Sequence, residues 1–315
     1  MANKKLEAGG YLPAKASFLD PQRLDGERPE DARAVVIPFG LEASVSYGSG
    51  TARGPAAILA ASQQLELFDE ELWREPYLDY GVAALREPKI KRKAAKALEQ
   101  LADIVEQVLS TGRFPLVLGG EHSLTAGAIR PFAARHRDLA VLQFDAHADL
   151  RDGYLGEKYS HAAAMRRVLD HSAVRLVSVG IRAISLEEAT FLEANPERIT
   201  IHWGKDQARW DIEEIVRPLR GRPVYVTFDI DALDAAIMPA TGTPVPGGLS
   251  YLQALAILRR AAEVATIVGG DVVELAPMKG MHGCDFTAAA IAYKLLSYAL
   301  SGTGARRTPP RTIAV

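Results

Sequence analysis

The chain has 315 residues, of which 48% are apolar and 24% are charged, a composition typical of a folded globular protein. Its 37 basic and 39 acidic side chains leave a net charge of −2, which argues against a nucleic-acid partner bound by charge. The single cysteine, Cys284, excludes a disulfide within the chain and a cysteine-rich zinc site.

The sequence has no segment that predicts insertion into a membrane or export. No run approaches the ~18 consecutive apolar residues of a transmembrane helix. Lys4 and Lys5 are not followed by the apolar run of a secretory signal. We therefore expect a soluble, cytoplasmic protein without a membrane partner.

The chain divides into three parts by composition. Residues 1–30 contain many Pro, Asp and Arg residues and predict an irregular N-terminal arm. Residues 31–301 alternate short apolar runs with helical patterns and predict a single domain. Residues 302–315 predict a frayed C-terminal tail.

Short runs rich in Val, Ile and Leu predict the strands of this domain. They are nearly free of polar residues, as in strands that are buried on both faces of a parallel sheet. In chain order they are Ala34–Phe39, Pro115–Leu118, Leu139–Phe144, Arg175–Val179, Ile199–His202, Pro223–Phe228 and Val272–Leu275.

Helical patterns fill the gaps between the strands. They cover residues 55–68, 89–110, 123–135, 160–170, 186–194, 207–219, 250–264 and 285–300. Ser123, Ser185 and Ser250 are expected N-caps, and Pro55 suits the first turn of a helix. The alternation of strands and helices predicts an α/β fold, a three-layer αβα domain with a central, mostly parallel sheet. In such sheets, ligands bind beyond the carboxyl ends of the strands.

Acids and histidines follow several of the predicted strands at the point where each strand ends. The segments are Gly119-Gly120-Glu121-His122-Ser123, Asp145-Ala146-His147-Ala148-Asp149, Asp229-Ile230-Asp231 and the acid Glu274. Because the carboxyl ends of parallel strands meet at one edge of a sheet, we expect these side chains to converge.

Spacing within two of these segments supports the convergence. In an extended chain, residues two apart point to the same side, so Asp145, His147 and Asp149 are expected to share one face, as are Asp229 and Asp231. Carboxylates at such short range repel one another and need a counter-charge. The sequence has no run of Lys or Arg nearby, which favours a metal site.

The charge count favours two divalent cations. Four aspartates carry −4 and two divalent cations carry +4, while His122 and His147 add neutral nitrogen ligands. Oxygen-rich sites with some imidazole suit Mn²⁺ better than structural zinc, which prefers sulfur. Two ions roughly 3.5–4 Å apart can share a bridging water and lower its pKa. With hydroxide in place the site is near −1, which favours a cationic substrate.

Each segment alone also has a structural explanation. An isolated Asp-x-Asp is usually a turn or a solvated pair of acids, and Gly119–Ser123 could be a tight turn with a capping serine. The metal site is favoured because all of these segments occur in one chain and each lies at the end of a strand.

At these residues the sequence resembles the ureohydrolase family, which contains arginases, agmatinases and related amidinohydrolases. The resemblance runs from about residue 34 to 300. The matching segments are Tyr47–Pro55, Gly119–Ser123, Asp145–Arg151, Ser160-His161, Gly180–Arg182, Asp229–Asp234, Thr241–Gly248 and Glu274. The resemblance implies an arginase-type αβα fold, a binuclear centre with two Mn²⁺ per chain, and a homo-oligomer, either a trimer or a hexamer.

The resemblance also implies roles for individual residues. One ion would be held by His122, Asp145, Asp149 and Asp229. The other would be held by His147, Asp145, Asp229 and Asp231, so that Asp145 and Asp229 bridge the two ions. His161 matches the family's mobile histidine, which carries a proton to the departing amine, and Glu274 matches the acid that grips the guanidinium group. Asp149 could relay the first proton.

The segment Leu150–Gly156 lacks the Asn-Thr-rich stretch with which arginases bind the α-amino acid group, and is similar to the agmatinase branch. The resemblance therefore implies hydrolysis of agmatine to putrescine and urea, a step of polyamine biosynthesis. Guanidinobutyrate, guanidinopropionate and arginine are alternative substrates. Arg151 could attract a carboxylate, although an ion pair with Asp152 or a neighbour is the preferred interpretation. Departures from the family pattern at Ala162, Ala235 and Ala240 affect loops that bear on substrate choice.

Two other classes of protein remain open from the sequence. A zinc-dependent deacylase of related architecture would hold one ion with fewer acids. A non-catalytic metal-binding protein would lack a ligand or the proton-carrying histidine. His282, on a loop beyond Glu274, could contact substrate, although a purely structural position is preferred.

Overall fold

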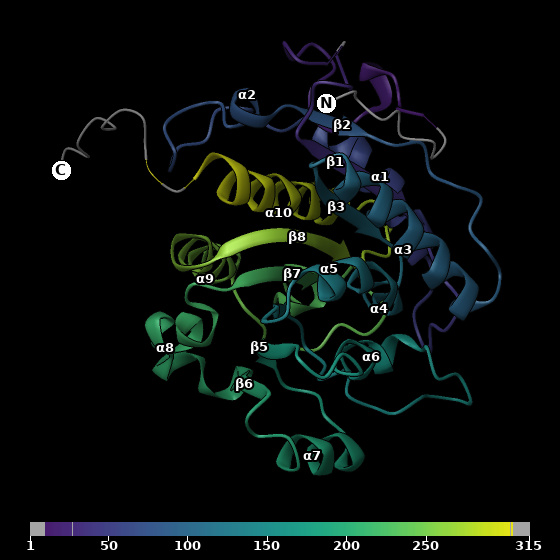
Figure 1. Cartoon of the computed structure of the whole chain (residues 1–315), viewed down its shortest axis with the longest axis vertical. Coiled ribbons are helices and arrows are strands. Elements are labelled where there is room, and N and C mark those ends of the chain that lie inside the picture. The colour runs from purple at the N-terminus through teal and green to yellow at the C-terminus, as the bar shows by residue number, and fades with distance from the viewer. Residues whose placement is uncertain (1–9, 27, 303, 305–315) are drawn as a thin grey trace.

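The structure is a computed structural model that describes residues 10–26, 28–302 and 304. Its centre is an eight-stranded sheet in which every neighbouring pair is parallel, in the order β2-β1-β3-β8-β7-β4-β5-β6 (Figure 1). The strands are β1 (Ala34–Phe39), β2 (Val82–Ala84), β3 (Phe114–Gly119), β4 (Ala140–Phe144), β5 (Arg175–Ile181), β6 (Ile199–Trp203), β7 (Pro223–Asp229) and β8 (Thr266–Val273).

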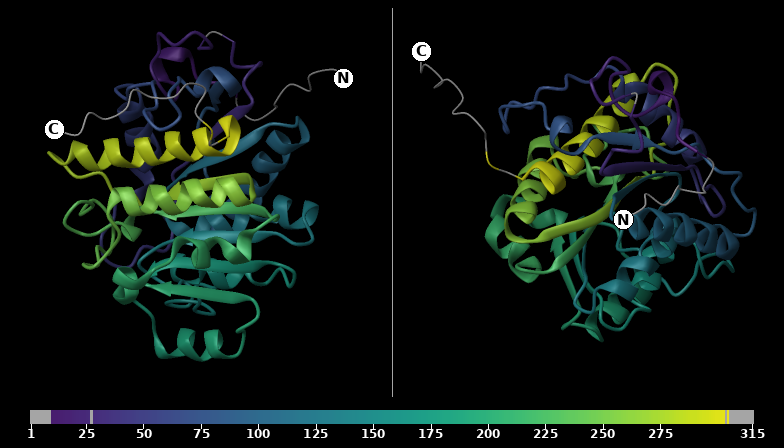
Figure 2. Two further views of the ribbon diagram at one scale, coloured as in Figure 1. Left: turned by 90° about the vertical axis from the view of Figure 1, so that its left-hand side faces the viewer. Right: turned by 45° about the horizontal axis from the view of Figure 1, so that its top comes forward.

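Helices cover both faces of this sheet. They are α1 (Gly54–Ser62), α2 (Tyr77–Tyr80), α3 (Ala94–Ser110), α4 (Thr125–Ala128), α5 (Arg130–Arg135), α6 (Ala164–Val168), α7 (Leu186–Glu193), α8 (Ile212–Val216), α9 (Tyr251–Val264) and α10 (His282–Ser301). One hydrophobic core joins α1, α8, α9 and α10 to one face of the sheet, and a second joins α3, α4, α5 and α6 to the other. Figure 2 shows α9 and α10 lying side by side on the first of these faces. The predicted three-layer αβα architecture is confirmed.

The pattern of buried residues explains the parallel sheet. All six residues of β1 and all five of β4 are buried, so each strand contributes side chains to both cores. Alternate residues belong to different cores, for example Val36 to the first and Val35 to the second. Strands of this kind read as unbroken apolar runs.

The expected capping residues were confirmed for two helices. Ser185 and Ser250 each form a capping box, in which the serine side chain accepts from the third residue of α7 or α9. Pro55 lies in the first turn of α1. The expectation for Ser123 was wrong, because its hydroxyl donates to Glu121 Oε1 and caps no helix.

Several predicted boundaries were wrong for identifiable reasons. The segment 123–135 is a 3₁₀ turn followed by α4 and α5, and Pro131 lies at the start of α5. The helix predicted to end at residue 68 ends at Ser62. Strand β8 begins at Thr266, six residues before the expected start at Val272, because Gly269 and Gly270 interrupt the apolar pattern. A side chain at Gly269 would overlap the ring of Phe132 on α5.

The described part of the expected N-terminal arm is irregular apart from a short 3₁₀ turn at Ala14–Ala16. It nevertheless packs on the domain, since Phe18 and Leu19 are fully buried in the first core. Most of the expected C-terminal tail lies outside the described residues. No helix in the ranges given above is long and apolar enough to span a lipid bilayer.

Candidate metal centre and substrate cavity

The site residues follow four strands that are neighbours at the middle of the sheet. His122 follows β3 and Glu274 follows β8. Asp229 is the last residue of β7, Asp231 comes two residues later, and the segment 145–149 follows β4. The register aligns the ends of these strands, because Leu118 pairs with Val272, Val273 with Asp229 and Phe144 with Phe228. The predicted convergence at the carboxyl edge is therefore observed.

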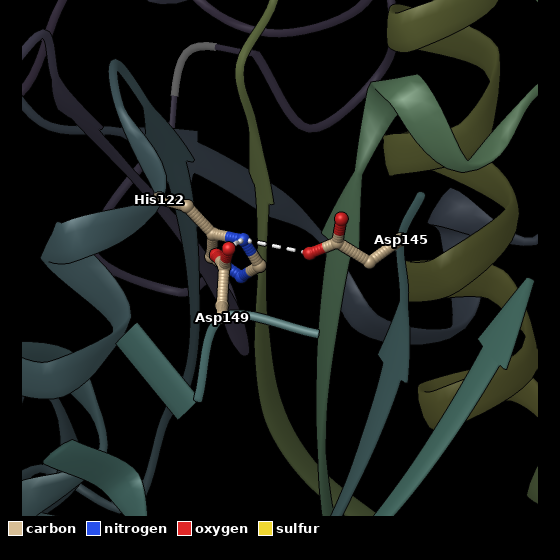
Figure 3. A group of neighbouring side chains, drawn as sticks. All are labelled: His122, Asp145 and Asp149. Atoms are coloured by element: carbon tan, nitrogen blue, oxygen red, sulfur yellow. Dashed lines mark ion pairs between the residues drawn. The ribbon is translucent and has the colours of Figure 1, made fainter. Parts of the chain in front are cut away.

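His122 is the centre of a first group of ligand-type side chains. Its Nδ1 lies 3.0 Å from Asp145 Oδ2, 3.1 Å from Asp149 Oδ2 and 3.3 Å from Asp229 Oδ2. Figure 3 shows the Asp145 carboxylate pointing from the end of its strand toward the His122 ring. All four residues are buried, and Nδ1 has no hydrogen-bond partner of good geometry.

His147 belongs to a second group that shares Asp145 with the first. Its Nδ1 lies 2.9 Å from Asp231 Oδ2 and 3.6 Å from Asp145 Oδ1. The segment after β4 is not extended, and Asp149 has a left-handed backbone with φ of 54°. The expectation that Asp145, His147 and Asp149 share one face is therefore wrong in detail. His147 belongs to the group with Asp231, Asp149 belongs to the group around His122, and Asp145 contacts both groups.

Hydrogen bonds hold the carboxylates in these positions. Asp145 Oδ1 accepts from the main-chain N of His147 at 2.6 Å, and Asp145 Oδ2 accepts from Gln143 Nε2 at 2.8 Å. Asp231 Oδ1 accepts from the main-chain N of Ala146 at 2.9 Å, which ties the end of β7 to the end of β4. Such outer contacts orient ligand atoms before a metal binds.

The cluster is electrostatically unfavourable without a cation. Burial and the nearby Asp145 carboxylate raise the pKa of Asp149 to about 6. Burial together with Asp231 and Asp145 raises the pKa of Asp229 well above its usual value. Burial opposes the charged form of His122, yet the three carboxylates around it raise its pKa well above the usual value. A divalent cation would replace protons as the counter-charge.

The donor set therefore fits divalent cations. An orphaned imidazole nitrogen faces three converging carboxylate oxygens, and a second imidazole faces two more. Carboxylate oxygens with a minority of imidazole nitrogens suit Mn²⁺ in preference to a thiolate-seeking metal. Thiolate ligands are absent, since the single cysteine, Cys284, does not line the cavity beside these groups.

Glu274 lies beside the first group and is held by an unusual backbone. Its φ is 65°, in the left-handed region that residues other than glycine seldom adopt. Its Oε1 accepts from the main-chain N of His122 at 2.6 Å. Without a cation nearby, burial raises the pKa of Glu274 to about 8, and a guanidinium group or metal ion beside it would lower that pKa again. Backbone conformations of this kind cluster at functional sites.

A cavity of about 160 Å³ opens above these groups. Its walls come from the loop after β1, the loop after β4, the segment at Thr241–Thr243 and the ends of β7 and β8. The cavity is smaller than the ~300–1,000 Å³ typical of sites for drug-sized ligands, which favours a slender substrate. Tyr47, at its rim, is 86% exposed.

His161 lines the same cavity, as expected for a residue that meets substrate. Its Nδ1 lies 3.2 Å from Ser44 Oγ and 3.4 Å from Ser160 Oγ, and its Nε2 lies 3.5 Å from Ser46 Oγ. Its ring meets the Tyr154 ring edge to face, with centroids 6.1 Å apart. His282, by contrast, is exposed and does not line the cavity.

Arg151 also lines the cavity, with its guanidinium 5.1 Å from the centroid of the Tyr154 ring. Its nearest acid is Glu188, at 3.9 Å, whereas Asp152 pairs with Arg167 at 2.7 Å. Of the two expected partners, Asp152 or a neighbour, the structure therefore gives Arg151 a loose ion pair with the neighbour, Glu188.

Sequence reasoning missed several residues that shape the site. Ser44, on the loop after β1, contacts His161, and no motif singled it out. Thr227, inside β7, lies 2.8 Å from His122 Nε2 and orients that ring. The alternation of side chains in β7, which places Thr227 and Asp229 on one side, could have indicated Thr227.

Comparisons with known proteins agree with this geometry. The family model described as "Arginase family" matches residues 32–299. An N(1)-aminopropylagmatine ureohydrolase from Synechocystis sp. is 37% identical over 85% of this chain and 89% of its own length. An agmatinase from Bacillus anthracis is 35% identical over 79% of this chain and 85% of its own length.

A solved structure has the same fold. The agmatine ureohydrolase of Thermoplasma volcanium superposes with a TM-score of 0.77 at 28% identity, covering 86% of this chain and 91% of that one. The resemblance drawn from the motifs is thereby confirmed at the level of the whole domain. The chain belongs to the arginase family and is a ureohydrolase of that family.

Proposed function

We propose that this ureohydrolase is manganese-dependent and hydrolyses agmatine to putrescine and urea. The observation that carries the proposal is the position of Glu274 beside the His122 group, within one small cavity that His161 also lines. This arrangement combines a site for two cations, an acid for a guanidinium group and a histidine for proton transfer.

Two Mn²⁺ ions would be held by the residues at the strand ends. The residues would be His122, Asp145, His147, Asp149, Asp229 and Asp231, of which Asp145 contacts both imidazoles. When bound, the ions supply a nucleophilic hydroxide at neutral pH and stabilise negative charge that develops on the substrate.

Glu274 binds the guanidinium group of the substrate. One of its oxygens is engaged by the main-chain N of His122, which fixes the carboxylate plane. A carboxylate grips a planar guanidinium through charge-assisted hydrogen bonds and orients its carbon for attack. Burial of Glu274 strengthens this attraction, because little water screens it.

Two residues handle protons in the proposed reaction. Asp149 accepts the proton released on attack, a role supported by its position in the lining of the cavity. His161, at the wall of the cavity, donates a proton to the departing nitrogen, which is otherwise a poor leaving group. The products are urea and a primary amine.

The small volume of the cavity favours a small linear substrate such as agmatine. N(1)-aminopropylagmatine, named for a relative, has the same guanidinium group and a longer amine tail. A guanidino acid such as guanidinobutyrate is the second candidate, because Arg151 is the one Arg or Lys among the described residues that line the cavity. A carboxylate tail would be attracted to it.

The remaining parts of the proposal concern the whole protein. Residues 31–301 form the catalytic domain, the active form is a homo-oligomer, a trimer or hexamer, and the protein acts in the cytoplasm. A zinc deacylase with one ion is disfavoured because ligand-type acids lie around both His122 and His147.

A urea-release assay of the Mn²⁺-loaded chain tests the proposal. The substrates are agmatine, N(1)-aminopropylagmatine, guanidinobutyrate, guanidinopropionate and arginine, and metal analysis accompanies the assay. We expect two Mn²⁺ per chain and the highest kcat/KM for agmatine, with loss of turnover in His161→Ala. A higher kcat/KM for guanidinobutyrate than for agmatine would make guanidinobutyrate the substrate in place of agmatine. One zinc per chain without urea release would overturn the proposal.

A further inference from the structure

Glu121 is a fully buried acid that the proposed reaction does not use. It follows β3 and precedes His122, yet its carboxylate points to the loop after β1. Its Oε2 accepts from the main-chain N of Ala43 at 2.7 Å and of Ser44 at 2.6 Å. Its Oε1 accepts from Ser44 Oγ at 2.8 Å and from Ser123 Oγ at 2.5 Å.

Ser44 joins this buried carboxylate to His161. The main-chain N of His161 donates to Ser44 Oγ at 2.9 Å, and His161 Nδ1 lies 3.2 Å from the same oxygen. Glu121, Ser44 and His161 are therefore connected in a line from the interior to the cavity, although they come from three separate segments of the chain.

The count of hydrogens decides the direction of these bonds. A serine hydroxyl has one hydrogen to donate and two lone pairs to accept with. The Glu121 carboxylate can only accept, and hydrogen bonds to a carboxylate are stronger than neutral ones, so the Ser44 hydrogen is directed to Glu121. Ser44 Oγ then presents only lone pairs to His161, one of which accepts from the main-chain N.

We propose that Glu121, acting through Ser44, is a positioning residue that fixes His161 in the tautomer with hydrogen on Nδ1. The second lone pair of Ser44 Oγ accepts from Nδ1–H. The unprotonated Nε2 is then the nitrogen that takes up and delivers the proton. This inference rests on the proposed function for the role of His161, but not for the tautomer itself.

A competing contact makes the proposal testable. Ser160 Oγ lies 3.4 Å from the same Nδ1, and a hydroxyl that donates to this nitrogen would favour the opposite tautomer. The competing contact is longer, and Ser160 has no carboxylate among the hydrogen-bond partners described for it.

Ser44→Ala is the informative variant. It removes the hydroxyl and leaves the two main-chain bonds from Ala43 and residue 44 to Glu121, so the loop keeps its anchor. Ser44→Thr restores the hydroxyl. Ser123→Ala is the matched control, because it removes a hydroxyl from the same Glu121 oxygen without touching His161. Ser160→Ala tests the competing contact.

The primary measurement is the tautomer of His161, from ¹⁵N NMR of the full chain with ¹⁵N-labelled histidine. The spectra are recorded without metal and with diamagnetic Mg²⁺, at a pH where free imidazole is neutral. The His161 signals are assigned by their loss in His161→Gln. We expect hydrogen on Nδ1 in wild type, Ser44→Thr, Ser123→Ala and Ser160→Ala, and a shift toward hydrogen on Nε2 in Ser44→Ala.

A wild-type signal with hydrogen on Nε2 overturns the proposal, as does an unchanged tautomer in Ser44→Ala or a shift in Ser160→Ala. In the Mn²⁺-loaded enzyme, Ser44→Ala is expected to lower kcat about tenfold, the equivalent of one lost hydrogen bond, with KM changed less than about twofold. If the wild type releases no urea from any guanidine, the proposed function fails, while the tautomer measurement still stands.

Discussion

Glu274 and His122 are joined by a hydrogen bond of 2.6 Å from the main-chain N of His122 to Glu274 Oε1. They are 152 positions apart in the chain. The acid proposed to grip the substrate is thereby fixed to the backbone of a proposed metal ligand, so the substrate and metal sites are positioned together.

This bond predicts the behaviour of Glu274→Gln. The amide oxygen can still accept from His122, so we expect metal content and folding to be retained. Loss of the charge should lower kcat/KM for a guanidinium substrate by about 100-fold, since charge-assisted hydrogen bonds contribute about twice as much as neutral ones. Steady-state urea release and metal analysis of the same preparation check this. Unchanged kcat/KM would remove Glu274 from the substrate site.

Asp145 is shared by both ligand groups, and its replacement should affect both ions. We expect Asp145→Asn to bind fewer than two Mn²⁺ per chain and to lose at least about 100-fold in urea release, because even outer-sphere changes cost 10–100-fold. Near-normal turnover in Asp145→Asn would refute the bridging role.

Removal of metal should destabilise the wild-type fold. The buried acids around His122 repel one another once the cations leave, and bound ligand stabilises by about 2.7 kcal/mol at a free concentration of 100 Kd. Thermal unfolding with EDTA, and then with added Mn²⁺, measures the difference. We expect a clear rise in Tm with Mn²⁺ for wild type and a smaller rise for Asp145→Asn. Equal rises would place the stabilising ions elsewhere.

Gly120 is a position where the backbone leaves no space. A Cβ there would overlap the carbonyl oxygen of Leu41, while the carbonyl of Gly120 accepts from the main-chain N of Glu274 at 2.8 Å. Gly120→Ala should therefore destabilise the chain by about 1–3 kcal/mol and weaken Mn²⁺ binding.

Gly283→Ala is the matched control for this substitution. Nothing lies within 4 Å of a Cβ built at Gly283, which is in the first turn of α10, so this variant should be neutral or stabilising by about 0.5 kcal/mol. Denaturant unfolding compares the two variants, and equal effects would contradict the predicted overlap.

Asp271 on β8 predicts a pH dependence of stability. Burial raises its pKa, and its Oδ2 accepts from Thr125 Oγ1 at 2.8 Å and from Tyr225 OH at 2.7 Å. Because the folded chain holds this proton more tightly than the unfolded chain, stability falls as pH rises through the interval above the usual Asp pKa of about 3.9. Asp271→Asn has no proton to lose and keeps an oxygen to accept both bonds.

Unfolding in urea with EDTA present, measured from pH 3 to pH 8, tests this reasoning. We expect Asp271→Asn to exceed wild type in stability at neutral pH, with the difference shrinking toward about pH 4. A difference that grows as the pH falls has the wrong sign for a raised pKa.

Local sequence patterns predicted much of the fold. The strands from Ala34–Phe39 to Pro223–Asp229 were found within one or two residues, except for the short strand β2, because a strand buried on both faces is an unbroken apolar run. The predicted boundaries of an element were wrong where contact with a distant residue determines which residue type the local position can hold. Gly269 is a glycine because Phe132 occupies the space beside it, and no pattern within β8 contains that information.

Local patterns in the sequence indicated the candidate metal ligands and Glu274, because acids and histidines after buried strands are conspicuous and the ends of such strands meet at one sheet edge. Which of these side chains contact one another could be read only from the folded chain. Strands β8 and β7 insert between β3 and β4, which places Glu274 beside His122. The left-handed backbone at Asp149 directs His147 and Asp149 into different groups. Strand order and side-chain rotation depend on contacts between distant segments, whereas sequence periodicity reports only which faces of one segment are buried.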